Sequence, residues 1–234
     1  MKRFYKTATA QAEADGTISV RLDGRAMKTP AKADMRLPSM ALAEAIAAEW
    51  EAQQGEVKPA EMPLTRLAAT AIDRVGADRS FATDEIVRYG DTDLLSYRAG
   101  DQEDLNAKQV AAWQPLLDWF RDRFDVQLAV TTGIMAVPQP EELKPRLHKI
   151  CAAYDVFHLT ALHAATSNTG SVVLGLALLE GRVDAVTASE TSLLDELHQT
   201  SLWGEDAEAA HRRANLAADL QATARFLALL KVAA

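Results

Sequence analysis

The chain has 234 residues, of which 48% are hydrophobic and 25% are charged, a composition typical of a globular protein. Its 33 acidic and 25 basic residues give a formal net charge of −8. That balance would repel a phosphate backbone, so nucleic acid is not an expected partner. Cys151 is the single cysteine, which excludes an internal disulfide and a zinc site built from several thiolates.

No segment has the pattern of a membrane span or a secretory signal. The longest apolar stretch is residues 172–179, interrupted by Gly175, whereas a bilayer span needs roughly 20 residues. The basic residues at the N-terminus are not followed by the apolar region of a signal peptide. We therefore expect a cytoplasmic protein without membrane insertion.

The first forty residues predict a small antiparallel sheet. Apolar and polar residues alternate over residues 18–22, the period of a half-buried strand, and an Asp-Gly pair precedes and follows the run. Asp-Gly supplies the backbone conformation of tight hairpin turns. The pattern predicts a meander with strands near residues 4–10, 17–22 and 25–29. A sheet this small needs a cover to be stable.

Two helices are predicted directly after the sheet. The first covers residues 41–54, with Ser39 as its N-cap and apolar residues at four-residue spacing on one face. Trp50 belongs to that face and is expected in the core. The second helix is predicted over residues 64–75, where apolar residues follow the helical spacing at every step.

The remainder of the chain is predicted to be helical. The expected helices cover residues 106–124, about 143–154, 156–166, 172–179, 184–203 and 206–231. Pro115 should kink the first of them, and Asp155 and Asp184 can cap two others. Residues 126–130 alternate and predict a short strand or an extended connector. The fold class is α+β: an N-terminal α+β domain at 1–80 and a helical domain at 81–234.

The residues that could carry chemistry do not form a recognisable catalytic or metal-binding motif. There is no glycine-rich phosphate loop and no nucleophile elbow. His158 and His163 are five residues apart, whereas zinc-binding helices use a four-residue gap. Residues 91–93 resemble the start of a calcium loop but lack its glycine and closing glutamate, which favours a cap or turn. We expect no catalytic residue, no metal and no cofactor, with Cys151 buried and inert.

Eight ordered segments are similar to a known protein family. They are Leu22-Asp23-Gly24-Arg25 with Lys28-Thr29-Pro30, Leu37-Pro38, Ala48-Glu49-Trp50 with Gln53-Gln54, Met62-Pro63-Leu64-Thr65, Ala71-Ile72-Asp73, the run from Tyr89 to Arg98, Gln109-x-x-x-Trp113-x-Pro115-Leu116 and Gln199-x-x-x-Trp203-Gly204. Together they resemble the assembly chaperones that protect the α subunit of the F-type ATP synthase. The resemblance runs from Phe4 to about Leu230. Mitochondrial members carry a leader that is absent here, which fits an alphaproteobacterial relative.

The resemblance implies a function and a place for it. It implies a non-enzymatic chaperone that binds the free α subunit until a β subunit replaces it, and that acts as a monomer without ATP hydrolysis. Glu196, Gln199, Trp203 and Glu205 are the positions expected to contact this client. The alternative for Gln199 and Trp203 is that they only pack the last two helices together.

Two other functions stay open from the sequence. One is a small-molecule enzyme with a site between the two domains, using Asp91, Asp93 and a histidine. The other is a structural subunit retained in the mature ATP synthase. A bound ligand or metal would favour the first, and a stoichiometric presence in the purified synthase would favour the second.

Overall fold

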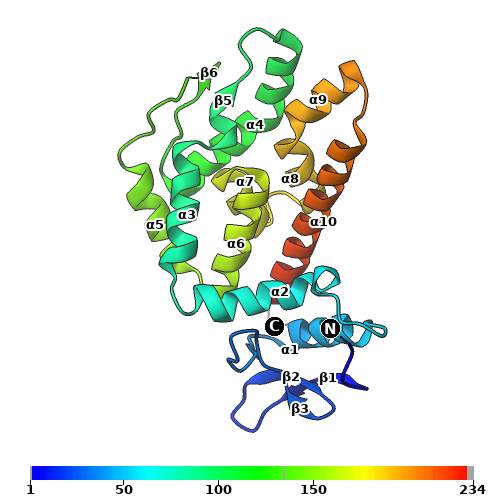
Figure 1. Ribbon diagram of the computed structural model, residues 1–234. Helices are drawn as coiled ribbons and strands as arrows, with labels where there is room; N and C mark the ends of the chain where they lie inside the picture. The colour runs from blue at the N-terminus through cyan, green and yellow to red at the C-terminus, as the bar shows by residue number, and fades with distance from the viewer. Residues whose placement is uncertain (1, 134, 231–234) are drawn as a thin grey trace. The chain divides into compact units, whose positions relative to one another are not determined.

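The structure is a computed structural model that describes residues 2–133 and 135–230. Contacts divide the chain into two compact units (Figure 1). The first comprises Met1–Phe81, Asp155–Ala161 and Arg225–Ala234, and the second comprises Ala82–Tyr154 and Leu162–Ala224. Two later helical segments therefore join the N-terminal unit, which local sequence patterns do not indicate. That residues 1–80 and 81–234 are separate domains stays a prediction.

The sheet of the first unit has four short strands, β1 (Ala8–Ala12), β2 (Ile18–Leu22), β3 (Arg25–Ala26) and β4 (Arg36–Leu37). β1 and β3 pair antiparallel with β2, as the predicted meander requires, and β4 also pairs with β2. The Asp-Gly turn has both central residues at positive φ, 49° at Asp23 and 79° at Gly24. This is the conformation that a two-residue hairpin favours.

The prediction was wrong about two strand boundaries and missed β4. The first strand does not begin near residue 4, because Arg3 is bonded elsewhere: its N–H donates to the carbonyl of Gly55 at 2.8 Å and its Nη1 to that of Gln53 at 2.6 Å. The third strand is shorter than residues 25–29. Two-residue strands such as β4 carry no periodicity for a sequence pattern to reveal.

Helix α1 (Met40–Glu51) covers one face of the sheet (Figure 1). The Ser39 side chain accepts from the N–H of Leu42 at 3.1 Å, which confirms the predicted N-cap. Leu42 and Ile46 are fully buried, but Trp50 is only half-buried, so its expected place in the core is wrong. The Trp50 ring lies at the end of the helix, 5.5 Å from the ring of Tyr5.

The second predicted helix changes its winding partway. A 3-10 turn (Pro59–Glu61) precedes α2 (Pro63–Thr70), which continues as a π-helical segment at Ala71–Val75. The Glu49 carboxylate caps α2 by accepting from the N–H groups of Leu64 and Thr65, each at 2.8 Å. This contact ties α2 to α1 within the first unit.

The remaining elements run from α3 to α10. They are α3 (Ser80–Asp91), a 3-10 turn (Leu94–Ser96), β5 (Tyr97–Arg98), α4 (Glu103–Phe124), β6 (Thr131–Thr132), α5 (Leu143–Ala153), α6 (Val156–Thr169), α7 (Val172–Leu179), α8 (Ala185–Ser192), α9 (Leu194–Trp203) and α10 (Ala207–Leu230). The predicted helix 184–203 is two helices that meet at Leu193. Residues 126–130 are a connector, and the strand follows at β6, parallel to β5.

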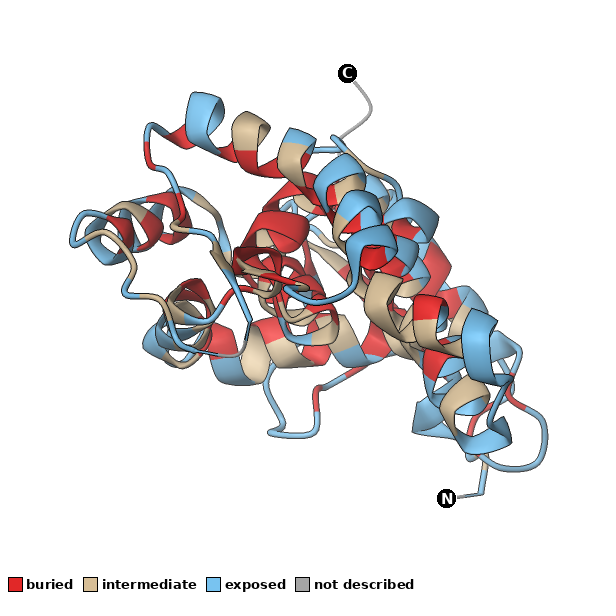
Figure 2. Ribbon diagram, turned by 90° about the horizontal axis from the view of Figure 1, so that it is seen from above, coloured by how far each residue is buried: buried red, intermediate tan, exposed pale blue. Residues whose placement is uncertain are grey.

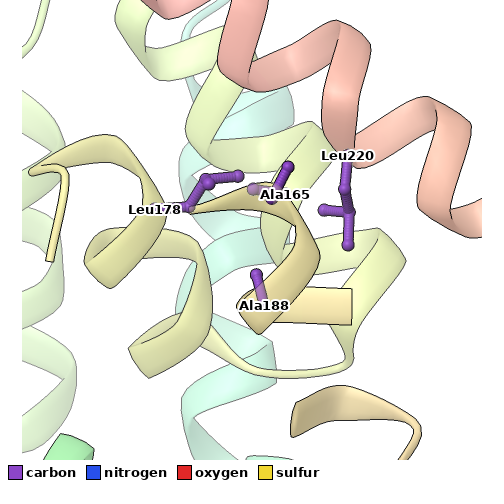
Figure 3. Packing of buried hydrophobic residues seen from close by; sticks show 5 residues of the cluster. Ala165, Leu178, Ala188 and Leu220 are labelled. Carbon is purple, nitrogen blue, oxygen red and sulfur yellow. The ribbon is translucent and has the colours of Figure 1, made fainter. Parts of the chain in front are cut away.

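Helix α7 is the buried centre of the second unit, as its uniformly apolar sequence predicts. Residues 172–178 are all buried, and the buried segments of this unit are red in Figure 2. A neighbouring cluster joins α6, α7, α8 and α10 through Ala165, Leu178, Ala185, Ala188 and Leu220 (Figure 3). The small alanines let these helices approach closely.

Asp93 is a fully buried carboxyl group beside α7. Its Oδ1 accepts from the N–H of Leu95 at 3.0 Å, and its Oδ2 accepts from the N–H of Val173 at 3.3 Å. Burial raises the pKa of Asp93 to about 6, although these hydrogen bonds oppose the increase. Residues 91–93 are thus a cap, as predicted. Within the described part of the chain, no helix has both the length and the hydrophobicity to cross a bilayer.

Candidate partner-binding surface

The four residues that were expected to contact a client lie along α9 and in the turn that follows it, from Glu196 in the first turn of the helix to Glu205 after its end. Glu196, Gln199 and Trp203 have the spacing i, i+3, i+7, which places them on one stripe of the helix. Gly204 ends α9 with φ at 91°, a conformation that glycine adopts without strain, and Glu205 follows it. The four positions therefore belong to one helix of the second unit and the turn after it.

One side of α9 is bound to α4 by side-chain hydrogen bonds. The Gln109 amide donates to Oδ1 of Asp195 at 2.8 Å, and Nζ of Lys108 lies 3.1 Å from Nδ1 of His198. Just before α9, the carbonyl of Thr191 accepts from the indole N–H of the fully buried Trp113 at 3.0 Å. Gln109 and Trp113 are residues of the family-like segments; here Gln109 binds α9 and Trp113 binds the last turn of α8.

The buried Arg98 contacts both Gln109 and Trp113 of α4. Arg98 donates from Nη1 to the carbonyl of Gln109 at 2.7 Å, and its guanidinium carbon lies 5.1 Å from the ring centroid of Trp113. The Gln109 Oε1 accepts from the N–H of Ala99 at 2.7 Å. Burial lowers the pKa of Arg98, and the negative charge of Asp195 partly offsets that effect.

The other side of α9 is bound to the start of α10 by an ion-pair network. Arg213 donates from Nη1 to Glu196 at 2.7 Å and from Nη2 to Glu205 at 2.6 Å, and Arg212 binds the second oxygen of Glu196. Burial by itself raises the pKa of Glu196, but the hydrogen bonds from Arg213 and Arg212 outweigh it and hold the pKa below its ordinary value. Glu196 and Glu205 are thus brought together through Arg213, a residue that the sequence analysis did not single out.

Gln199 is half-buried between α9 and the start of α4. Its Nε2 donates to Oε1 of Gln102 at 3.4 Å. Its own Oε1 is buried and has no hydrogen-bond partner among the residues that the structure describes. The contact joins α9 to the residue before α4, so packing of the last two helices by Gln199 stays a prediction.

Large apolar side chains remain exposed along α9. Trp203 is 77% exposed, Leu202 57% and Leu197 40%. An exposed indole next to exposed leucines is a common mark of a protein-binding surface. We call Leu197, Leu202 and Trp203 the α9 surface. Trp203 was predicted from the sequence and the two leucines were not, because local sequence does not show which residues of α9 other helices cover.

The histidines considered as metal ligands have carboxylate partners in separate places. Nδ1 of His158 lies 2.6 Å from Oδ2 of Asp155, and Nε2 of His163 lies 2.5 Å from Oε2 of Glu85. Within residues 2–133 and 135–230, no group of three or more histidine, cysteine, aspartate or glutamate side chains is arranged to hold a metal ion. Asp155 also caps α6, as predicted, by accepting from the N–H of Phe157 at 2.8 Å.

Comparison with known proteins gives consistent matches. The sequence model of the family described as ATP12 chaperone protein matches residues 2–121. The crystal structure of Atp12 from Paracoccus denitrificans is similar with a TM-score of 0.92 and 40% sequence identity, and the match covers 98% of each chain. A structure of a mutant of the same Paracoccus denitrificans protein matches equally well.

Two mitochondrial proteins are more distant relatives. Protein atp12 of Schizosaccharomyces pombe is 27% identical over 220 residues, covering 88% of this chain and 75% of that protein. Protein ATP12 of Saccharomyces cerevisiae is 22% identical over 248 residues, covering 87% of this chain and 76% of that protein.

Proposed function

The chain belongs to the ATP12 chaperone family, and from that premise we propose that it binds the free α subunit of the F-type ATP synthase and keeps it from aggregating. The proposal includes assembly of the catalytic head as the purpose of binding. It also includes action as a monomer in the cytoplasm, without catalysis and without a cofactor.

The exposed indole of Trp203 is the observation that supports the proposed binding surface. The side chain is 77% exposed, although tryptophan is the most costly of the apolar residues to leave in water. Hydrogen bonds to α4 and ion pairs to α10 hold α9 in place behind it. An aromatic side chain has few rotatable bonds and loses little conformational freedom on binding, which is why such residues act as anchors in interfaces.

An unassembled subunit needs a chaperone because of its exposed apolar surface. Such a subunit exposes apolar surface that its neighbours cover in the finished complex, and exposed apolar patches cause aggregation. A chaperone that covers the patch with an apolar surface of its own delays aggregation. It must bind less tightly than the final neighbour, so that the neighbour can replace it.

Aggregation of isolated α subunit, followed by light scattering without ATP, tests the proposal. We expect the wild-type chain to suppress scattering and Trp203→Ala to suppress it less, with affinity reduced about thirtyfold, the loss typical of one interface anchor. Met135→Ala is the matched control, because Met135 is 78% exposed but lies outside α9. Scattering that the wild-type chain leaves unchanged would contradict the proposed function. Equal effects of the two substitutions would contradict the assigned surface alone.

A further inference from the structure

The outer edge of β1 presents free backbone groups. Within the described residues β1 pairs with β2 alone, and Asp23 donates to the carbonyl of Thr7 at 3.0 Å. Hydrogen-bonded and outward-facing residues alternate in an antiparallel strand, so the peptide groups of Ala8, Ala10 and Ala12 point away from β2. The N–H of Ala8 is used by Oε2 of Glu51 at 2.8 Å. The outward groups of Ala10 and Ala12 have no such partner among the described hydrogen bonds.

A groove of about 630 Å³ runs along this edge, between β1 and α1. Its walls carry small side chains and two glutamates: Ala8, Thr9, Ala10, Glu44, Ala47, Ala48, Glu51 and Ala52. On the sheet face toward α1, β2 contributes Val20 and Leu22, whereas their cross-strand partners Ala10 and Ala8 contribute one methyl group each. The space that a larger side chain would fill at this edge is therefore open.

The groove is acidic. Glu44 and Glu51 both line it from α1. Glu51 is paired with Arg3 at 3.1 Å, whereas Glu44 is on the exposed stripe of α1 and has no ion pair among the described residues. A positive charge brought into the groove would therefore meet an available carboxylate at Glu44.

We propose that the β1 edge binds an extended segment of a protein partner as an additional strand. The added strand would hydrogen-bond to the outward groups of Ala10, place an apolar side chain over the open space and direct a basic side chain toward Glu44. Alternate residues of a strand face the same side, so the apolar and basic residues of the segment are two positions apart. A second copy of this chain is a poorer occupant, since pairing two β1 edges would bring glutamates of like charge together.

This inference goes beyond the proposed function and does not depend on the α9 surface, because a peptide alone tests it. The probes are two peptides with fluorescein on the N-terminal amine, fluorescein-Thr-Val-Thr-Lys-Thr-amide and the same peptide with Glu in place of Lys, measured by fluorescence anisotropy. We expect the lysine peptide to bind and the glutamate peptide to bind at least about tenfold more weakly. Equal affinity of the two peptides, or no binding of the lysine peptide, overturns the proposal.

Three variants locate the site. Ala10→Pro removes the outward N–H without removing a bond to β2, Ala48→Arg fills the groove with a cation, and Glu44→Lys reverses the charge. Each should weaken the lysine peptide about tenfold or more, while Glu141→Lys, the same charge change on an exposed loop residue, should leave it unchanged. Thermal unfolding confirms that each variant is folded. If Ala48→Arg and Glu44→Lys both fold and still bind the lysine peptide as wild type does, the β1 edge is not its binding site. If light scattering shows a wild-type dimer that Ala10→Pro abolishes, the occupant of the edge is a second copy of this chain, and the proposed partner segment is wrong.

Discussion

Arg213 donates a hydrogen bond to Glu196 across 2.7 Å, and this contact ties α10 to α9. Both residues lie in the second unit, 17 positions apart in the sequence, and the same guanidinium also binds Glu205 beyond the end of α9. Arg213 therefore binds the first turn of α9 through Glu196 and the turn after α9 through Glu205. Trp203 lies between these two contacts in the sequence.

Removal of this arginine should break both contacts. We expect Arg213→Met to lower the midpoint of thermal unfolding, because the substitution leaves Glu196 and Glu205 close together without their shared cation. Circular dichroism measures the midpoint. Arg212→Met is the control and should have a smaller effect, since the Arg212 side chain is 66% exposed whereas that of Arg213 is 10% exposed. Equal midpoints for the two variants would argue against the role of Arg213.

The buried indole of Trp113 should be important for stability through one hydrogen bond. Trp113→Phe keeps much of the apolar volume but leaves the carbonyl of Thr191 without its donor. We expect a loss of about 1–3 kcal/mol in the free energy of unfolding, measured by urea denaturation. Trp119→Phe is the matched control, because Trp119 is half-buried on the same helix. A loss as large at position 119 would mean that ring size, and not the hydrogen bond, determines the effect.

The close approach of α6 and α7 depends on Gly175. A Cβ atom at this position would lie 3.1 Å from the backbone nitrogen of Thr166 and would collide with the Thr166 hydroxyl. We expect Gly175→Ala to destabilise the fold by about 1–3 kcal/mol in urea denaturation. The double variant with Thr166→Ala should recover part of that loss, since it removes the colliding oxygen. Additive losses in the double variant would show that the hydroxyl is not the obstacle.

Asp93 predicts a pH dependence with a definite sign. Its pKa is raised from 3.8 to about 6, so the folded state holds a proton that the unfolded state releases. The contribution of Asp93 to the free energy of unfolding is fully present below the pKa of the unfolded state and is lost as pH rises through about 6. The pKa difference between the two states corresponds to a contribution of about 3 kcal/mol. Between pH 4 and pH 7, wild type should therefore lose stability relative to Asp93→Asn.

Asp184 is a control with the opposite pKa shift, since its pKa is lowered in the folded state. The N–H of Thr187 is the main cause that holds the pKa of this exposed helix cap below its ordinary value. Its stabilising contribution is present above the unfolded pKa and is lost as pH falls through the folded pKa. Relative to Asp184→Asn, wild type should gain stability as pH rises. Urea denaturation at several pH values measures both differences, and parallel curves for wild type and Asp93→Asn would refute the account of Asp93.

The sequence by itself determined the features that depend on neighbouring residues. The strand over residues 18–22, the turn at Asp23, the caps at Ser39 and Asp184, and the burial of residues 172–178 were all predicted, and the structure confirms them, although Ser19 is buried as well as Val20. The strand, the turn and the caps are short-range effects, in which a strand period, a permitted backbone angle or a side chain three residues away decides the conformation. The burial of residues 172–178 was predictable because a helix that is apolar on every side has no polar face to expose.

Tertiary structure alone decided which surfaces are covered. The contact between Gln109 and Asp195 joins residues 86 positions apart, and the pairing of β4 with β2 likewise depends on distant segments. Leu178 is buried and Leu202 is exposed although both are leucines on helices, because α6, α8 and α10 pack around the first and leave the second uncovered. Burial depends on what lies opposite a side chain, and that is fixed by the packing of elements that local sequence does not place.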